Sequence, residues 1–278
     1  MRVVVTGAAG FLGSHVCERL VADGHLVSGL DDLSTGHLSH LTAVRRRKGF
    51  GFHHFDAGSP LVADLVARER PDVVVHLAPV LPVHLLQAAR EGGARVVVGG
   101  SAEVYGITRA PVSERHGPHP ANLAGAHHAA VEAYVHAHVV RGLVAVTLRL
   151  ATVYGPRSAG VVSTWARALR AGRPTYLRGD GSGVRDLVHV DDVVDAVVRC
   201  LGGRADGRRL NVGTGTGTTL RALHTAVASA IGAPDAPDFR PVGEEDLASV
   251  LVDPGGARRA LGWEPTIGLQ EGLARTLS

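Results

Sequence analysis

Short apolar runs alternate with longer amphipathic stretches along the first half of the chain. Runs such as Val3–Val5 and Val73–Val75 are apolar at consecutive positions, as strands buried on both faces require. The predicted strands cover residues 2–6, 26–30, 52–55, 73–77, 96–99 and 144–149. The predicted helices cover residues 11–22, 61–68, 83–90 and 122–140. This alternation is typical of an α/β fold, in which a doubly wound parallel sheet carries helices on both faces.

After residue 149 the pattern loosens into segments rich in glycine and proline, among them RGDGSGVRD and VGTGTGT. Long connections of this kind lie over the carboxyl ends of parallel strands, where open α/β sheets bind their ligands. We therefore expect a smaller carboxyl-terminal substrate-binding lobe. The predicted boundaries are residues 1–154 for the sheet domain and 155–278 for the lobe, with residues 186–213 returning to the sheet.

A glycine-rich turn follows the first predicted strand, with the sequence TGAAGFLG at residues 6–13. Glycines there permit a tight turn and a close backbone approach to a pyrophosphate, which the dipole of the next helix stabilises. Asp31 ends the second strand about 20 residues further on, where a carboxylate binds the adenosine ribose hydroxyls. This combination predicts a Rossmann dinucleotide-binding domain. The negative charge of Asp31 repels a 2′-phosphate, so this residue favours NADH over NADPH. Asp32 and Ser34 also shape the ribose pocket, so NADPH is not excluded.

Composition excludes several other classes of protein. Hydrophobic residues make up 45% of the 278 positions and charged residues 20%, which suits a folded domain rather than a disordered chain. The net charge of +3 comes from arginines spread along the chain, so no nucleic-acid partner is predicted. The single lysine of the sequence is Lys48. A mechanism that needs a catalytic lysine would therefore have to use this residue.

Targeting and metal-binding signals are not recognisable in the sequence. Cys17 and Cys200 are too few and too far apart for a disulfide framework. No apolar stretch approaches the ~18 residues of a membrane span, and the amino-terminal residues lack the pattern of a signal peptide. We therefore expect a cytoplasmic protein with no membrane partner. The histidines between residues 116 and 138 lack the spacing of a zinc site, so no metal site is predicted.

Eight short motifs occur in order along the chain. They are TGAAGFLGSH, DDLSTG, HLA, SAEVYG, LRLATVYGPR, RGDGSGVRDLVHVDDV, LNVGTGTG and ALGWEPTIGLQEGL. With these motifs in this order, the chain resembles an extended short-chain dehydrogenase/reductase of the NAD-dependent epimerase/dehydratase family. The resemblance extends nearly from end to end. The resemblance implies an NAD(P)H cofactor and a small-molecule substrate. The cofactor-binding residues predicted in this way are Gly7, Gly10, Phe11, Leu12, Gly13, Asp31, Asp32, Leu33, Ser34, Thr35, Gly36, Asp56, Ala57, Leu77, Ala78, Pro79, Gly99 and His128.

The sequence departs from this family at its catalytic centre. The family uses a serine or threonine after the fifth strand together with a Tyr-x-x-x-Lys pair on the next helix, where a spacing of four places both side chains on one face. Ser101 in SAEVYG fills the first position. Alignment on Gly125 and Glu132 places Ala124 where the family has the tyrosine and His128 where it has the lysine. Both usual catalytic partners are therefore missing.

Two further departures concern the substrate side. The segment between HLAPV and the fifth strand is shorter than the family's by roughly two or more helical turns, which predicts a more open cleft. Because both helices of the usual family dimer are altered, we expect a monomer or a weak homodimer. Thr152 replaces an asparagine that contacts the sugar nucleotide in the family, whereas Arg185, which pairs with a diphosphate there, is retained.

These departures favour reduction of a ketone over oxidation of a sugar. Sugar oxidation needs a base, which contributes about 10²–10⁴ in rate, whereas reduction needs only a donor for the developing oxyanion. The main hypothesis is therefore an NAD(P)H-dependent ketoreductase of antibiotic biosynthesis. Its substrate would be an aromatic polyketide ketone, since the chain is similar to atypical ketoreductases that act on angucyclinones. The alternatives are a nucleotide-sugar epimerase, dehydratase or decarboxylase with substituted catalytic residues, and a non-catalytic cofactor-binding protein.

Few side chains remain as candidates for the chemistry. Ser101, Glu103 and His128 are the predicted catalytic residues, since Glu103 aligns with a glutamate of family dehydratases and an imidazole titrates near neutrality. For Glu103 and His128, a plain polar residue beside the cleft is the competing interpretation. The predicted substrate-binding residues are Ser101, Tyr105, Thr152, Trp165 and Arg185.

Overall fold

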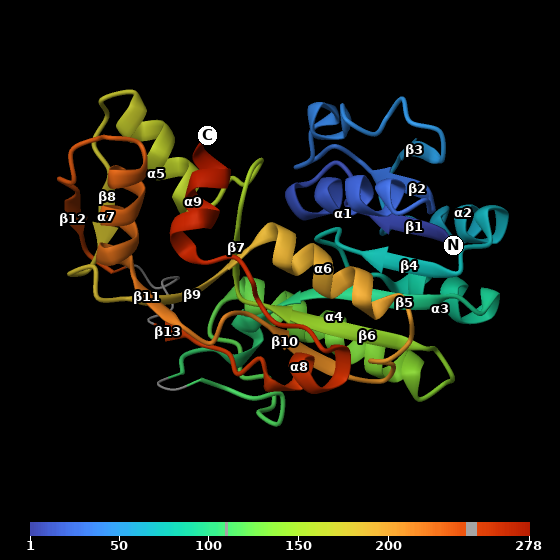
Figure 1. Ribbon diagram of the computed structural model, residues 1–278. Coiled ribbons are helices and arrows are strands. Elements are labelled where there is room, and N and C mark those ends of the chain that lie inside the picture. Colours follow the sequence, from blue (N-terminus) through green and yellow to red (C-terminus); the bar gives the residue numbers. More distant parts are fainter. Residues whose placement is uncertain (109–110, 243–248) are drawn as a thin grey trace. The chain divides into compact units, whose positions relative to one another are not determined.

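The computed structural model describes residues 1–108, 111–242 and 249–278. The chain forms two compact units that are interleaved along the sequence. Unit 1 comprises residues 1–100, 127–149 and 194–210, and unit 2 comprises residues 101–126, 150–193 and 211–278. These boundaries differ from the predicted ones, which were residues 1–154 and 155–278 with residues 186–213 returning to the sheet, because the chain passes between the units several times. Figure 1 shows the elements of both units.

A seven-stranded sheet forms the centre of unit 1, in the order β10-β6-β5-β4-β1-β2-β3 (Figure 1). Its strands are β1 (Arg2–Thr6), β2 (Leu26–Asp31), β3 (Phe50–His54), β4 (Val73–His76), β5 (Arg95–Ser101), β6 (Ala145–Leu150) and β10 (Arg209–Val212). β1 runs parallel to β2 and β4, and β3 and β5 pair in parallel on either side of them. The predicted doubly wound, Rossmann-like parallel sheet is thus confirmed.

Helical segments accompany this sheet along the chain, and several of them pack apolar residues against it. They are α1 (Phe11–Ala22), η1 (Leu38–Leu41), α2 (Val62–Glu69), α3 (Val83–Gly92), α4 (Leu123–Val139) and α6 (Val190–Cys200). α2, α3 and α4 contribute Leu65, Leu85 and Val131 to one core cluster that also holds Val4 and Val96 of the sheet. α1 contacts β1 and β2 through other positions. Burial of these continuous valine runs is the main force that fixes unit 1.

Unit 2 is built from short strands and three packed helices. Its strands are β7 (Thr152–Tyr154), β8 (Tyr176–Arg178), β9 (Val184–His189), β11 (Gly217–Thr219), β12 (Asp238–Arg240) and β13 (Ser249–Val250). Its other elements are η2 (Ala102–Tyr105), α5 (Val161–Arg170), α7 (Leu220–Ala230), α8 (Gly255–Leu261) and α9 (Leu269–Leu277). Trp165, Leu223 and Leu273, one from each of α5, α7 and α9, meet in its core. β9 pairs with β7, β11 and β13, while β8 pairs with β12.

The predicted return of residues 186–213 to the main sheet holds for part of that segment. β10 joins the seven-stranded sheet, but β9 belongs to the smaller sheet of unit 2. The side chain of Asp186 explains the position of β9, because its carboxylate accepts hydrogen bonds from the Thr214 and Gly215 amides at 2.8 and 3.0 Å. A buried carboxylate satisfied in this way fixes the strand within unit 2.

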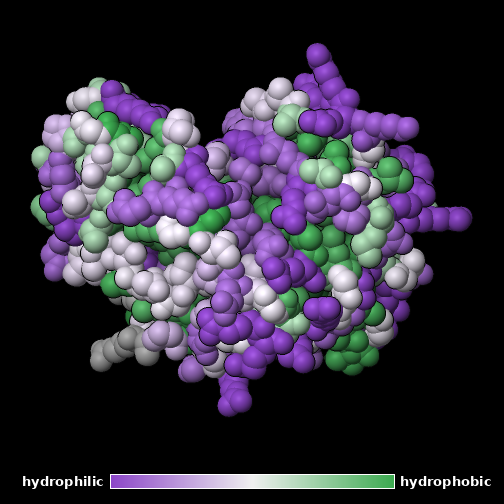
Figure 2. Space-filling model, viewed as in Figure 1, coloured by the Kyte–Doolittle hydropathy of each residue, from purple (hydrophilic) through white to green (hydrophobic). Residues whose placement is uncertain are grey.

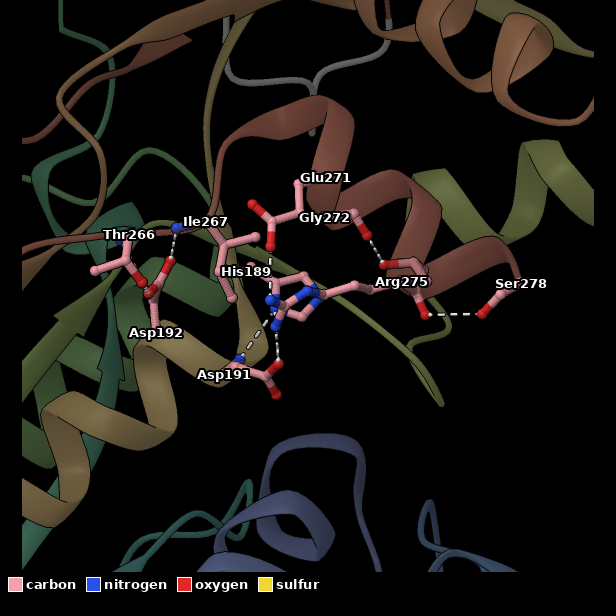
Figure 3. A network of polar contacts seen from close by, with 10 residues as sticks. His189, Asp191, Asp192, Thr266, Ile267, Glu271, Gly272, Arg275 and Ser278 are labelled. Carbon is pink, nitrogen blue, oxygen red and sulfur yellow. Dashed lines mark hydrogen bonds and ion pairs between the residues drawn. The ribbon is translucent and has the colours of Figure 1, made fainter.

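The carboxyl-terminal helix is anchored where β9 continues into α6 (Figure 3). The Asp192 carboxylate accepts hydrogen bonds from the Thr266 amide at 3.0 Å and the Ile267 amide at 3.1 Å. Arg275 of α9 donates to Asp191 at 3.2 Å and lies beside Glu271. The Asp191 amide donates to His189 Nδ1 at 3.2 Å. Because burial lowers the pKa of His189, this imidazole is neutral in the anchor.

The visible surface is largely hydrophilic (Figure 2). Arg45, Arg46, Arg47 and Lys48 are all exposed between η1 and β3. The single lysine of the chain therefore belongs to a solvated basic segment of unit 1 rather than to a helix. Within the described parts of the chain, no helix is both long and apolar enough to cross a membrane.

Candidate cofactor and substrate sites

The glycine-rich turn between β1 and α1 is closed tightly by its neighbours. Gly7 has a φ of +70°, and a Cβ there would lie 2.8 Å from the Ala78 nitrogen. A Cβ on Gly13 would lie 1.9 Å from the Gly7 carbonyl oxygen, so α1 can approach the turn only through a glycine. Gly10, the residue before α1, makes no side-chain cap to the first helical turn. The geometry fits an anion bound by these backbone amides.

Asp31 is held in a fixed orientation at the end of β2. Its side chain accepts hydrogen bonds from the Ala9 amide at 2.9 Å and the Leu33 amide at 2.8 Å, one on each carboxylate oxygen. Leu33 adopts a φ of +61°, and a Cβ on Gly36 would lie 2.7 Å from Asp31 Oδ1. Each oxygen keeps a second lone pair for a ribose hydroxyl. Both donors are backbone groups of unit 1, one from the glycine-rich turn and one from the residues just after β2, so the carboxylate is oriented before any ligand arrives.

One pocket of unit 1 gathers most of the predicted cofactor residues. Its lining residues are Gly7, Gly10, Phe11, Leu12, Leu30, Asp31, Asp32, Ser34, Thr35, Asp56, Ala57, Leu77, Ala78, Pro79 and Val80. Leu30 and Val80 were not predicted. Three further predicted residues shape the turns behind the pocket: Gly13, Leu33 and Gly36. Gly99 lies on β5 beside Leu77, and a Cβ on Gly99 would lie 2.5 Å from Leu77 Cδ2. The tight glycine turn, the pocket and the oriented carboxylate fit a dinucleotide.

Behind the pocket, the buried imidazole of His76 ties β1 to the segment that follows β4. Its Nε2 donates to the Val80 carbonyl at 3.1 Å, so its Nδ1 accepts the hydroxyl proton of Thr6 at 2.8 Å. The Thr6 oxygen also accepts the Leu77 and Ala78 amides at 3.3 and 3.4 Å. Burial lowers the pKa of His76 to about 4, which keeps the imidazole neutral in this network.

A second pocket lies entirely within unit 2 and is polar. Its lining residues are Ser101, Ala102, Glu103, Asn122, Leu150, Ala151, Thr152, Arg185 and Val250. Ser101, Glu103, Thr152 and Arg185 were predicted, and the structure brings these four together. Asn122 was missed, although its place just before α4 is typical of a helix amino-terminal cap, and its side chain does accept the Gly125 amide at 2.8 Å.

Ser101 and Glu103 are positioned by the turn that follows β5. The Ser101 hydroxyl oxygen accepts the Glu103 amide at 3.1 Å, which leaves its own hydrogen for another acceptor. Asn122 Nδ2 donates to Glu103 Oε2 at 3.4 Å. A Cβ on Gly125 would lie 2.4 Å from the Glu103 carbonyl oxygen, so the first turn of α4 packs directly on η2. Ala124 precedes this contact and supplies only a methyl group where the family has a phenol.

No tyrosine of the chain replaces the missing phenol in the unit 2 pocket. The predicted substrate residue Tyr105 is 5% exposed, and its hydroxyl donates to Asn211 at 2.7 Å. Burial raises the pKa of Tyr154 to about 12, so this phenol stays protonated. Tyr134 lies on the exposed side of α4, and Tyr176 carries the Arg240 guanidinium 3.4 Å above its ring.

Two further predicted site residues, Trp165 and His128, lie outside the unit 2 pocket. Trp165 is 7% exposed, packs edge-on against His224 and belongs to the helical core, so its predicted place in a substrate wall finds no support. His128 lies on the part of α4 that belongs to unit 1, edge-on to His127 at 5.5 Å between ring centroids. Among the residues that the structure describes, no cluster of His, Cys, Asp and Glu could hold a metal ion.

Comparisons with known proteins identify the relatives of this chain. The NAD dependent epimerase/dehydratase family matches residues 3–84 and 79–213. The UDP-glucose 4-epimerase of Mycolicibacterium smegmatis is 43% identical over 309 positions, covering 100% of this chain and 97% of the relative. The UDP-glucose 4-epimerase of Thermus thermophilus in complex with NAD is 34% identical, with a TM-score of 0.89 and coverage of 100% and 98%.

The UDP-glucose 4-epimerase of Thermotoga maritima with UDP-glucose is 30% identical, with a TM-score of 0.92 and coverage of 100% and 97%. These relatives contradict the main hypothesis from the sequence. A ketoreductase of aromatic polyketides in antibiotic biosynthesis was the wrong choice, because it gave two missing side chains more weight than the eight motifs that are present. The alternative of a nucleotide-sugar epimerase or dehydratase fits the relatives better. NAD is the cofactor, and the chain belongs to the NAD-dependent epimerase/dehydratase family.

Proposed function

We propose that this protein is an NAD-dependent enzyme acting on a nucleotide sugar, with epimerisation at a hexose hydroxyl as its reaction. The observation that carries the proposal is the polar pocket of unit 2, which combines Ser101, Glu103, Thr152 and Arg185. Its relatives in Mycolicibacterium smegmatis and Thermotoga maritima are UDP-glucose 4-epimerases, and the latter is in complex with UDP-glucose. These names favour a UDP-hexose as the ligand of this pocket.

Unit 1 supplies the cofactor site in this proposal. The turn at Gly7 and Gly10 would hold the pyrophosphate, and Asp31 would hold the adenosine ribose. When bound, NAD accepts and returns a hydride, which allows a sugar carbon to be oxidised and then reduced. The aspartate favours NAD over a cofactor with a 2′-phosphate, in agreement with the Thermus thermophilus relative.

Glu103 is the proton acceptor in this proposal. Oxidation of a hydroxyl requires removal of its proton, and no phenol lies in the pocket to take it. The Glu103 carboxylate is partly buried, and Asn122 donates a long hydrogen bond of 3.4 Å to one of its oxygens. One or both of its oxygens therefore remain able to accept a substrate proton. Ser101 would donate its hydroxyl hydrogen to the same sugar oxygen.

Arg185 is the residue that would bind the diphosphate of the nucleotide. One of its guanidinium nitrogens donates to the Val184 carbonyl at 3.0 Å, which fixes the side chain along β9. A guanidinium presents several donors in one plane and suits phosphate oxygens well. Thr152 stands at the start of β7 in the same pocket and offers a hydroxyl in place of the family's asparagine.

Ala124 and His128 favour a second candidate, a protein that binds NAD and a nucleotide sugar without turnover. A base contributes about 10²–10⁴ in rate, so loss of both family partners could leave binding intact and abolish the reaction. In that case Glu103 would be a polar residue at the wall of the pocket. Binding and turnover must therefore be measured separately.

The test uses the full chain with NAD and a panel of UDP-glucose, UDP-galactose, UDP-glucuronate and dTDP-glucose. Calorimetry measures binding, and NMR of the sugar anomeric protons measures conversion. We expect a UDP-hexose to bind and to be converted. Glu103→Gln should reduce conversion by about 100-fold or more with little change in binding, while Glu91→Gln on the exposed surface should change neither. Binding without conversion supports the second candidate, and no binding of any nucleotide sugar overturns both.

A further inference from the structure

The connection between β4 and α3, residues 77–82, forms one wall of the cofactor pocket. Leu77, Ala78, Pro79 and Val80 all line that pocket. β4 ends at His76 and α3 begins at Val83, so the connection has no helix or strand of its own. The length of this connection therefore limits how much of unit 1 can cover this side of a bound cofactor.

The comparisons show that a relative is longer than this chain. The Mycolicibacterium smegmatis relative aligns over 309 positions, whereas this chain has 278 residues, so the relative carries residues that this chain lacks. The family matches the chain in two separate stretches, residues 3–84 and 79–213, which overlap at residues 79–84. We assign part of the missing length to this change from one stretch to the other, which lies at the wall of the cofactor pocket.

The short connection is also fixed in place. The Thr6 oxygen accepts the amides of Leu77 and Ala78, and His76 donates to the carbonyl of Val80. Ala78 and Val80 pack against the core of unit 1. Pro79 and Pro82 restrict the backbone further, because each ring fixes its φ angle. The connection is held on the core and cannot swing across the pocket as a lid does.

A shorter, fixed wall weakens cofactor retention. Removing contacts from about 60 Å² of apolar cofactor surface lowers affinity roughly tenfold at the usual value per unit area. Among related complexes, such losses act mostly on the dissociation rate.

We propose that this chain holds NAD and NADH as exchangeable ligands, which dissociate much faster than from the UDP-glucose 4-epimerase of Mycolicibacterium smegmatis. The inference rests on the pocket of unit 1 and does not depend on which substrate unit 2 binds. Its consequence is a difference in stoichiometry. If a sugar leaves after the oxidation step, a protein with an exchangeable cofactor releases one NADH for each oxidised product and binds a new NAD. A protein with a permanently held cofactor cannot do this.

The first test compares this protein with the UDP-glucose 4-epimerase of Mycolicibacterium smegmatis. Each is loaded with NADH and mixed with excess NAD in a stopped-flow instrument, and the loss of bound-NADH fluorescence gives the dissociation rate. We expect a rate at least 10-fold faster for this chain, and no stoichiometric nucleotide in the protein as purified. Equal rates, or a full complement of nucleotide that survives purification and dialysis, would overturn the proposal.

The second test assigns the effect to the connection. In this chain, residues 79–82 are replaced by the corresponding longer segment of the relative, and a control receives a Gly/Ser segment of the same length. We expect the native segment to slow NADH release at least 10-fold and the control to leave it fast. If the insertion prevents folding, the reciprocal deletion in the relative replaces it and should accelerate release. No sugar is present in either experiment, so failure here is distinct from failure of the proposed function.

Discussion

At the scale of single residues, His76 couples the stability of unit 1 to pH. Burial lowers its pKa from the usual 6.5 to about 4 in the folded protein. Between these two values the unfolded chain binds a proton that the folded chain does not. The free energy of unfolding therefore falls as the pH drops from about 6.5 to about 4, by up to roughly 3 kcal/mol from this residue.

Urea unfolding at pH 7.5 and pH 5.0 measures this dependence. In the variant His76→Asn the decrease between the two pH values should be clearly smaller than in the parent protein, although the variant starts from a lower stability. Burial also lowers the pKa of His138 and His189, but both remain in the two proteins, so the difference isolates His76. An identical decrease in both proteins would show that His76 does not carry the effect.

At the same scale, we expect Asp31 to contribute strongly to cofactor affinity. Asp31→Asn keeps one oxygen but removes the charge and places an amide nitrogen opposite the Ala9 or Leu33 amide, now donor against donor. We expect the Kd for NADH, measured by fluorescence titration, to rise at least about 10-fold. Asp23→Asn, at the end of α1 and paired with Arg19, is the matched control and should leave the Kd unchanged. Similar values for all three proteins would contradict the assignment of Asp31.

At the scale of elements, a buried ion pair ties α4 to β6. The Arg149 guanidinium is 1% exposed and donates to both oxygens of Glu132, at 2.8 and 2.7 Å. Arg209 lies 3.5 Å from the same carboxylate. Glu132→Gln removes the negative charge that neutralises this buried guanidinium. We expect a loss of about 3–5 kcal/mol in the free energy of unfolding, measured by urea denaturation.

The double variant Glu132→Leu with Arg149→Met tests the cause of this loss. Replacing both charges with apolar groups of similar size should recover more than half of it, because no buried charge is left unneutralised. A single variant that loses less than about 1 kcal/mol, or a double variant no better than the single, would show that the pair does not hold α4.

Sequence patterns identified the elements of unit 1 better than those of unit 2. The valine runs of β1, β4 and β5 are buried on both faces, so local composition alone marks them as strands. β8 and β12 are short, and each exists through pairing with the other, which lies far away in the sequence. Most of β9 falls within residues 186–213, which were expected to return to the main sheet. The hydrogen bonds of Asp186 that place it in unit 2 leave no local pattern.

At the scale of the whole molecule, most of the residues that line the two pockets were predicted from the sequence as site residues. The glycine turn and Asp31 carry their own pattern, because the backbone geometry of a dinucleotide site demands particular residues at particular spacings. Side chains such as Val80 and Asn122 enter their pockets through backbone turns that no motif records. Function was misassigned at Ala124 and His128, because a missing side chain shows what a site has lost and not what it binds.

Restoring the missing pair tests the function of the whole molecule. Ala124 and His128 are four residues apart on the continuous helix α4, so Ala124→Tyr with His128→Lys returns both side chains to one helical face. If the nucleotide sugar binds as proposed, the double variant should interconvert UDP-glucose and UDP-galactose at least about 100-fold faster than the parent protein, followed by NMR. His128→Lys alone lacks the phenol and should gain much less. A double variant that binds NAD and UDP-glucose yet converts no faster would show that the bound sugar does not lie where the tyrosine of an epimerase would reach it.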